Sequence, residues 1–375
     1  MSPEKAPARP RRILVVFAWL MVGGEETEVR LLAKHLDPAR YTIDVVACLR
    51  RPGMPEQTHR QLADLGVQVD RTPYALSFED TVAYLAVKIA RYDLVVACQG
   101  VPDIHAALDL LPNPPPLIEH GGLVSEVTAT PKRHTTRYVG VCASIRAAAA
   151  AAMPERPQHA LEIPSMVDLA EFDPGARPAV RRAWGVDANM PVMGWIGRLD
   201  RKKRVEDFIR AAALVLVRHP HARFVIVGGP DAYMPEYAGE LRELAAHLEL
   251  GAALSFLGDR PDVPRLLSGL DALVWLSRGE GMPHVIAEAG AARLPVIATR
   301  DNGSEQQIID GVTGLFVPHE SPSAVAEGMD RLIAGPALRA RLGGNLRRKV
   351  EREYAADIVV PRWQALFDEV LAQRI

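Results

Sequence analysis

Short apolar runs alternate with amphipathic stretches along most of the chain. A helical pattern at 25–36 follows the first run, and similar patterns separate most of the later ones. The runs are rich in β-branched residues and, in the first half, predict strands at 13–18, 42–48, 93–98, 116–120 and 138–143. Because these runs are apolar on both faces, they are typical of parallel strands covered by helices.

The rhythm stops between residues 154 and 191, where six prolines punctuate the chain as at a domain boundary. Beyond it, strands are predicted at 191–197, 223–229, 253–258, 271–276 and 294–299. The tail is helical, and Pro361 is expected to kink or restart its last helix. The pattern predicts an α/β fold of two doubly wound, Rossmann-like parallel-sheet domains. Their ligands are expected in a cleft beyond the carboxyl ends of the strands.

Composition agrees with two soluble domains. The chain has 375 residues, of which 48 % are hydrophobic and 24 % charged, which is material for more than one ordinary core. The net charge of -2 gives no bias toward nucleic acid. Cys48, Cys98 and Cys142 lie in apolar runs without metal-ligand spacing, as buried thiols in a reducing compartment do.

The segment 9–22 combines arginines with a short apolar run, as a signal peptide does. The run is too short to span a bilayer, and no small-x-small cleavage pattern follows it. We interpret it as a buried first strand. A cytoplasmic protein is expected, with peripheral contact at the inner membrane face as the alternative.

Several catalytic and cofactor motifs are absent from the sequence. There is no G-x-G-x-x-G after a strand, no P-loop, no H-E-x-x-H, no C-x-x-C and no G-x-S-x-G. An NAD-dependent oxidoreductase therefore lacks its fingerprint. No D-x-D pair is present to hold a metal-bound diphosphate, so neither a metal nor a cofactor is expected.

Two cations follow the first strand of the second domain. Arg198 leaves the carboxyl end of strand 191–197, and Lys203 comes five residues later at a helix start. This arrangement suits an anionic ligand, because arginine can bind phosphate oxygens in a bidentate manner. A solvated basic turn is the alternative.

The stretch RGEGMPHVIAEAG, residues 278–290, occupies the equivalent place after strand 271–276. Glu280 lies on a turn between two glycines, and Pro283 is a good first residue of the helix that carries Glu288. Backbone amides at this helix start can receive a phosphate. Alternatively, Glu280 only caps the helix and Glu288 is exposed.

These motifs, in order, resemble the retaining glycosyltransferases of family 4, which have the GT-B fold. The resemblance covers nearly the whole chain. In the second domain it rests on GRLDRKK (197–203), EGMPHVIAEA (280–289) and LPVIATRDNGSEQQIIDGVTGLFV (294–317). In the first domain it includes Gly23-Gly24, HGG (120–122), VCAS (141–144) and IPSMVD (163–168).

The resemblance implies a role for each matching residue of the second domain. Arg198 and Lys203 would bind the diphosphate of a sugar nucleotide, and Glu280 would lie by the donor sugar. Glu288 would bind the ribose. The helix-start residues that would contribute to donor binding are Gly281, Met282, Pro283 and His284. The stretch around Gly303 and Glu305 matches a G-G-x-x-E region at the back of the donor site, with one glycine replaced.

In the first domain, the resemblance places Gly23 and Gly24 opposite the diphosphate. His120 would lie near the reacting sugar and, with Arg198, Lys203 and Glu280, would act in catalysis. A structural histidine at the end of a strand is the alternative for His120. Ser165-Met166 replaces an N-G pair that is frequent in the family, and His284 stands where asparagine is frequent.

The implied reaction is the transfer of a sugar from a nucleoside-diphosphate sugar to a hydroxyl of an unknown acceptor, with retention and without metal. UDP-sugars are favoured, with GDP-sugars as the alternative. A sugar-nucleotide epimerase or hydrolase and a catalytically silent binding protein are the competing functions. The expected domains are 1–165 on the acceptor side, 166–355 for the donor, and a helix at 356–375 that crosses back to the first domain.

The acceptor is not specified by any motif; a glycan, a lipid-linked glycan or a small molecule would all fit. The basic loop TPKRHTTR, residues 130–137, could receive an anionic acceptor or a lipid headgroup. A solvated basic loop is the alternative, and the same two interpretations apply to Arg9, Arg11 and Arg12.

Overall fold

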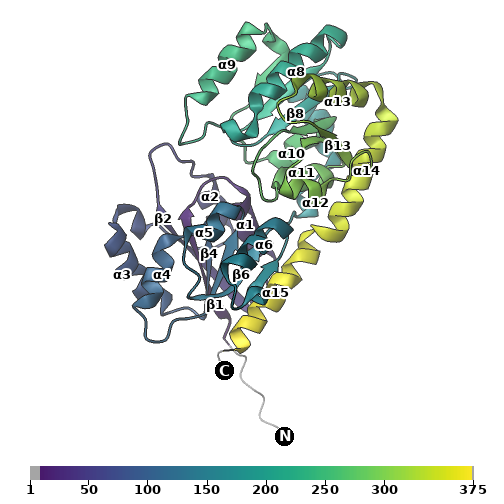
Figure 1. The fold of residues 1–375 in the computed structure, drawn as a ribbon. Coiled ribbons are helices and arrows are strands. Elements are labelled where there is room, and N and C mark those ends of the chain that lie inside the picture. Colours follow the sequence, from purple (N-terminus) through teal and green to yellow (C-terminus); the bar gives the residue numbers. More distant parts are fainter. Residues whose placement is uncertain (1–8, 374–375) are drawn as a thin grey trace. The chain divides into compact units, whose positions relative to one another are not determined.

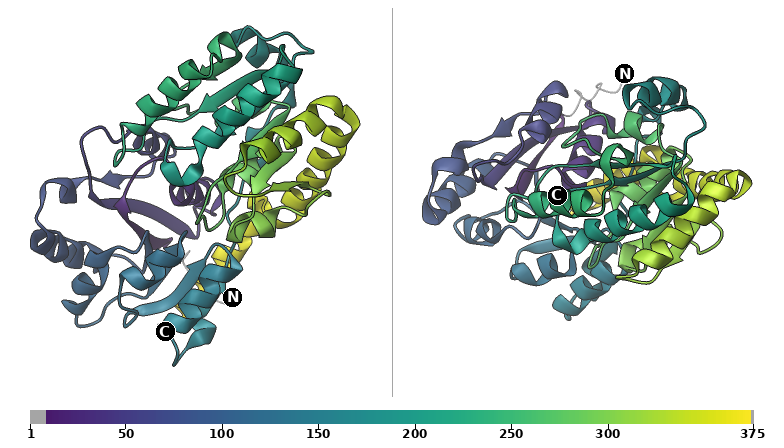
Figure 2. Two further views of the ribbon diagram at one scale, coloured as in Figure 1. Left: turned by 45° about the horizontal axis from the view of Figure 1, so that its top comes forward. Right: turned by 90° about the horizontal axis from the view of Figure 1, so that it is seen from above.

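A computed structural model describes residues 9–373, which fold as two α/β units. Unit 1 combines residues 1–164 with the C-terminal stretch 357–375, and unit 2 is formed by residues 165–356. Each unit contains one sheet with helices packed on it (Figures 1 and 2). All strand pairs within the two sheets are parallel, as the alternation of strands and helices predicts.

The sheet of unit 1 has seven strands in the order β3-β2-β1-β4-β5-β6-β7. Its strands are β1 (Arg11–Trp19), β2 (Tyr41–Leu49), β3 (Val69–Asp70), β4 (Leu94–Cys98), β5 (Leu117–Gly121), β6 (Thr135–Gly140) and β7 (Ala160–Glu162). Its helices are α1 (Gly24–His35), α2 (Gln57–Asp64), α3 (Phe78–Ile89), α4 (Pro102–Asp109), α5 (Val124–Ala129), α6 (Ala143–Ala152) and α15 (Ala356–Ala372). One part of the core joins β1, β2 and β4 to apolar residues of α3 and α4.

The sheet of unit 2 has six strands in the order β10-β9-β8-β11-β12-β13. Its strands are β8 (Val192–Ile196), β9 (Arg223–Val227), β10 (Leu254–Phe256), β11 (Ala272–Trp275), β12 (Val296–Thr299) and β13 (Gly314–Val317). Its helices are α7 (Arg177–Ala183), α8 (Val205–Arg218), α9 (Tyr237–His247), α10 (Val263–Leu267), α11 (His284–Ala291), α12 (Asn302–Gln307), α13 (Pro322–Ala334) and α14 (Pro336–Glu353).

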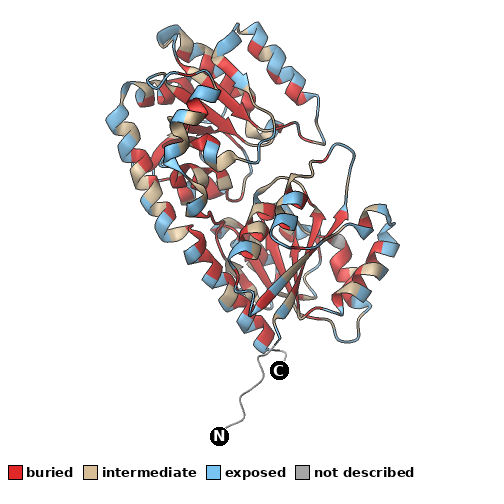
Figure 3. Ribbon diagram, turned by 180° about the vertical axis from the view of Figure 1, so that it is seen from behind, coloured by how far each residue is buried: buried red, intermediate tan, exposed pale blue. Residues whose placement is uncertain are grey.

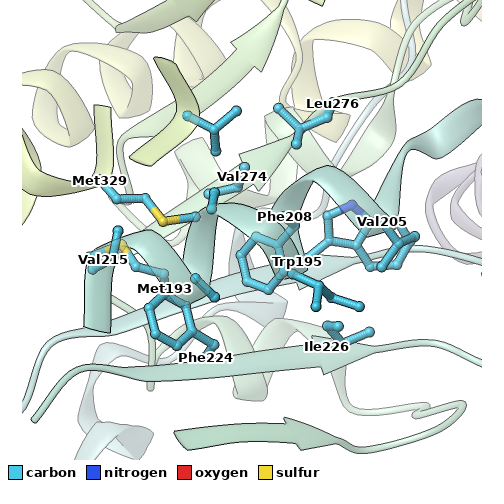
Figure 4. Close-up of a cluster of buried hydrophobic side chains, with 14 of the residues drawn as sticks. Met193, Trp195, Val205, Phe208, Val215, Phe224, Ile226, Val274, Leu276 and Met329 are labelled. Carbon is cyan, nitrogen blue, oxygen red and sulfur yellow. The ribbon is translucent and has the colours of Figure 1, made fainter. Parts of the chain in front are cut away.

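The burial of the strands explains why their sequences are continuous apolar runs. The strands are almost wholly buried, whereas most helices keep an exposed outer face (Figure 3). In unit 2, Trp195 of β8 and Phe224 of β9 pack against Phe208 of α8, and all three are fully buried (Figure 4). This packed core fixes the positions of the strand ends.

Three features differ from the sequence prediction. Strand β6 begins at Thr135 and ends at Gly140, because Cys142 already caps α6 and the hydroxyl of Thr135 bonds the buried Glu119. The strands β3, β7 and β13 were not predicted. Pro361 was expected to kink or restart the last helix. The helix does not restart there, because α14 ends at Glu353 and α15 begins at Ala356 and continues through Pro361.

Candidate functional site

The carboxyl ends of β8 and β11 carry the charged residues that the sequence singled out. These strands are neighbours at the centre of the unit 2 sheet, and the strand order runs outward from them in opposite directions. Ligands of doubly wound sheets bind at such a switch point. The segment after β8 carries Arg198 and Lys203, and the segment after β11 carries Glu280 and leads into α11 with Glu288.

Lys203 and Glu280 form an ion pair at this point. Nζ of Lys203 lies 3.1 Å from Oε1 of Glu280, and both side chains are at least 86 % buried. Nζ of Lys202 lies 3.5 Å from the same oxygen, and the hydroxyl of Ser277 donates to it at 2.8 Å. The Lys203 ammonium also lies 4.4 Å from the centre of the Trp275 ring, a cation–π contact. Sequence reasoning missed Lys202 and Trp275, which only the folded geometry brings to the pair.

The pair changes the titration of both partners. Burial alone would raise the pKa of Glu280, but the charges of Lys203 and Lys202 and the Ser277 hydrogen bond lower it to about 2. Burial lowers the pKa of Lys203, and the negative charge of Glu280 opposes this change. Glu280 is therefore a carboxylate throughout the physiological range, held beside a desolvated ammonium.

Arg198 is oriented by a buried carboxylate. Its Nε lies 2.8 Å from Oδ2 of Asp231, whose other oxygen accepts the backbone N–H of Tyr233 at 2.7 Å. Asp231 is 4 % exposed and follows the Gly228-Gly229 turn after β9. A Cβ at Gly228 would lie 1.7 Å from the carbonyl oxygen of Gly197, so glycine lets the two strand ends approach backbone to backbone. Sequence reasoning missed Asp231, although its place after a strand and two glycines is a signal.

The loop that bears Glu280 is held by the start of α12. The backbone N–H of Glu280 donates to Oδ2 of Asp301 at 2.7 Å. Gly279 adopts a φ of 70°, which favours glycine. A Cβ at Gly303 would lie 1.8 Å from the carbonyl oxygen of Gly281. The stretch around Gly303 therefore supports the loop from behind. Glu305, whose role the sequence left open, is exposed and lies 3.5 Å from Arg300.

Helix α11 begins at His284, one residue later than expected, and Pro283 is its N-cap instead of its first residue. His284 and Glu288 lie one turn apart on this helix, and both are partly exposed. The small residues of α11 were expected to admit a ligand closely. At Gly290 it is α14 that approaches instead, because a Cβ there would lie 2.6 Å from a methyl of Val350.

The residues that replace the family's N-G pair also contact this loop. The backbone N–H of Ser165 points at the sulfur of the buried Met282 at 3.4 Å. Val167 forms a backbone bridge with Ala355. The segment is thus fixed to unit 2 by backbone contacts that need no glycine.

In unit 1, His120 is the second-last residue of β5 and lies beside the start of α1. Its Nδ1 is 3.8 Å from Oε1 of Glu25 and 4.0 Å from the sulfur of Cys98, and its ring packs edge-on against Trp363. Gly23 caps α1, where a Cβ would lie 2.5 Å from Oε2 of Glu26. The structure therefore places the predicted Gly23-Gly24 turn and the predicted His120 at the same edge of the sheet, after β1 and in β5, with β4 between these strands. It adds buried glutamates that the sequence gave no reason to single out.

The basic loop 130–137 is engaged within unit 1. Lys132 pairs with Glu119 at 2.9 Å, Arg133 and His134 pair with Asp109, and Arg137 pairs with Glu369 of α15. Each of these four side chains therefore has a carboxylate partner within unit 1.

Two of the N-terminal arginines also lie near carboxylates. Arg9 pairs with Asp93 at 2.9 Å, and Arg12 lies 3.6 Å from Asp44.

Across residues 9–373, no group of three or more His, Cys, Asp and Glu side chains could hold a metal ion. Among the helices in that range, none is long and apolar enough to cross a membrane.

Most of unit 2 matches the profile of a known protein family. Residues 176–349 match the family profile described as "Glycosyl transferases group 1". A D-inositol 3-phosphate glycosyltransferase of Actinosynnema mirum is 32 % identical over 195 residues, covering 50 % of this chain and 47 % of the relative. A protein of the same name from Corynebacterium urealyticum is 33 % identical over 174 residues, covering 44 % and 41 %. The match thus spans less than half the length of these relatives.

Solved structures resemble the whole chain in fold. The Anabaena protein HepE, in complex with UDP and glucose, aligns with a TM-score of 0.82 and 20 % identity, covering 95 % of this chain and 99 % of its own. Sucrose-phosphate synthase of Thermosynechococcus elongatus aligns with a TM-score of 0.77 and 19 % identity, covering 97 % and 100 %. Residues 176–349 therefore match the glycosyltransferase group 1 profile, in a chain whose two units have the α/β architecture of the GT-B fold.

Proposed function

We propose that the protein is a retaining glycosyltransferase of family 4. It moves a sugar from a nucleoside-diphosphate sugar to an acceptor hydroxyl without a metal ion. The observation that carries the proposal is the placement of Arg198, Lys203 and Glu280 at the carboxyl ends of neighbouring strands in the group 1 domain. UDP is the favoured leaving group over GDP, and the UDP bound by HepE supports this choice.

The charges fit the chemistry of the proposed transfer. The bond between the anomeric carbon and the diphosphate oxygen breaks, and the acceptor oxygen forms a new bond to the same carbon. The acceptor proton passes to the departing diphosphate. Negative charge grows on the diphosphate and positive charge on the sugar, so cations held in place before reaction stabilise the transition state.

Each charged residue of unit 2 has a distinct part in this proposal. Arg198, held by Asp231, and Lys203, held by Glu280 and Trp275, need little reorganisation to meet a diphosphate. A diphosphate beside Lys203 also favours the charged ammonium, against the effect of burial. Glu280 would be repelled by the phosphates and bind sugar hydroxyls instead.

Metal dependence and stereochemistry test the mechanism directly. A thermal-shift screen with UDP, GDP and ADP and their sugars would first identify the donor, because a ligand of the native state raises the melting temperature. With that donor, turnover is expected to survive EDTA, and NMR of the product is expected to show the donor's anomeric configuration. Inversion, or loss of turnover in EDTA that manganese restores, would contradict the proposal.

The two glutamates should differ in what they contribute. Glu288→Gln is expected to weaken UDP binding by about 1–3 kcal/mol, the scale of a lost charged hydrogen-bond partner. Glu280→Gln removes a negative charge that lies 3.1 Å from Lys203, so it should leave UDP affinity unchanged or tighter while lowering turnover. Calorimetric titration of both variants with UDP decides this division. It is wrong if Glu280→Gln loses as much affinity as Glu288→Gln.

A further inference from the structure

The first turns of α1 carry three buried glutamates. Glu25 is 9 % exposed, Glu26 4 % and Glu28 1 %. Two of the nearby carboxylates are satisfied by the protein. Glu26 accepts hydrogen bonds from the backbone of Met21 and the side chain of Gln99, and Glu126 accepts the N–H groups of Gly122 and Leu123. We call Glu25, Glu26, Glu28 and Glu126 the acidic cluster.

Glu25 contributes an unsatisfied carboxylate oxygen to this cluster. Among the described residues, its Oε1 has no hydrogen-bond partner, although that atom is buried. The nearby groups are Nδ1 of His120 at 3.8 Å and the backbone of Gly122, against which the carboxylate lies. Burial and the charges of Glu126 and Glu26 raise the pKa of Glu25, and only a backbone hydrogen bond from Gly122 opposes this. An incoming cation would relieve the same repulsion.

The loop cations of unit 1 already have other partners. Lys132, Arg133 and Arg137 pair with Glu119, Asp109 and Glu369, none of which belongs to the acidic cluster. The electrostatic effect of the acidic cluster extends to Cys98. Burial raises the pKa of this thiol, and the charges of Glu25 and Glu26 raise it further. Gly24, which precedes Glu25 at the helix start, is exposed.

We propose that the acidic cluster binds a positively charged acceptor, an amino sugar or aminocyclitol, whose ammonium donates to Oε1 of Glu25. This inference rests on the proposed glycosyl transfer and adds the class of acceptor. A hydroxyl neighbouring the ammonium would receive the sugar beside His120, which lies 3.8 Å from Glu25. The amine itself forms no covalent bond and keeps its proton, so the reaction balances as described above.

Matched acceptors that differ in a single charge test the proposal. The probes are methyl glucosaminide, methyl N-acetylglucosaminide and methyl glucoside, together with a diaminocyclitol and its N-acetylated form. Each is incubated with the full-length protein and the donor found by thermal shift, and product is measured by mass spectrometry. The free amines are expected to react with kcat/KM at least about tenfold higher than their neutral partners, the scale of a buried charged contact.

A charge-removing variant links the preference to the site. Glu25→Gln should lower the preference for amines by at least about tenfold while leaving UDP affinity intact. Glu79→Gln, the same change in the first turn of α3 at an exposed position, should leave the preference unchanged.

The outcomes separate this inference from the proposed function. Equal use of neutral acceptors, transfer to none of the amines while UDP is released from the donor, or an unchanged preference in Glu25→Gln overturns the amine site alone. Failure to bind any sugar nucleotide overturns the proposed function as well.

Discussion

Replacing Lys203 by methionine is expected to lower kcat/KM for the donor by at least about 30-fold, or ~2 kcal/mol of transition-state stabilisation. The Lys203 side chain is 89 % buried, and its ammonium lies 3.1 Å from Glu280 and over the Trp275 ring. A charge fixed in this way costs no reorganisation when negative charge grows on the diphosphate. Methionine keeps the length and the apolar stem, so the variant tests the charge. Steady-state kinetics with the donor and calorimetry with UDP measure the loss.

Lys202 supplies the matched control. Its ammonium lies 3.5 Å from the same Glu280 oxygen, but its side chain is 34 % exposed and screened by solvent. Lys202→Met should therefore cost no more than about threefold. The UDP affinity of the double variant Lys203→Met/Glu280→Gln shows whether the loss arises only from leaving Glu280 unpaired, because Glu280→Gln alone is expected to lower turnover but not UDP affinity. A similar loss in Lys202→Met and Lys203→Met, or full recovery of UDP affinity in the double variant, would argue against a direct phosphate contact by Lys203.

The parallel sheets could be predicted because their strands are buried on both faces. Runs such as 13–18 and 271–276 have no polar alternation, and the helices between them show a different period. The edge strand β3 was not predicted, because it is not buried on both faces. The two residues of β3 are partly exposed, and their pairing with β2 comes from the fold, not from local preference.

The sequence could predict only those site residues that directly follow strands. Arg198, Lys203 and Glu280 follow strands, and parallel strands bring their carboxyl ends to one edge, which explains why the structure gathers Lys203 and Glu280. The partners that orient them could not be found in this way. Asp231, Trp275 and Asp301 contact these residues from at least 21 positions away in the sequence, and no local pattern encodes such contacts.

Glu25 shows a different limit. An acidic residue in the first turn of a helix is ordinary, because it complements the helix dipole. Its burial beside three other glutamates becomes apparent only when α1 packs next to β5 and α5. A glutamate at this position is ordinary in the sequence, but burying its charge in the folded protein costs free energy. This cost is why Glu25 indicates a bound ligand.

Replacing Trp363 by alanine is expected to give the largest loss of stability, about 3–5 kcal/mol, with a melting temperature lower by roughly 10 °C. Trp363 lies on α15, is 1 % exposed and packs against Phe367 and edge-on against His120 at 5.3 Å between ring centres. Its removal leaves a cavity beside His120, so turnover should fall even at temperatures where the variant is folded. UDP affinity should be unchanged, because the proposed nucleotide site lies in unit 2. Differential scanning calorimetry and calorimetric titration with UDP provide the two measurements.

Ile358 offers the control on the same helix. Its side chain is 41 % exposed, so Ile358→Ala should cost under about 1 kcal/mol and leave turnover intact. Trp363→Phe keeps an aromatic edge toward His120 and should recover part of both the stability and the turnover. If Trp363→Ala melts within 2 °C of the wild type, α15 does not stabilise unit 1 through this side chain. If the variant is destabilised but turns over normally when folded, Trp363 supports the fold without positioning His120.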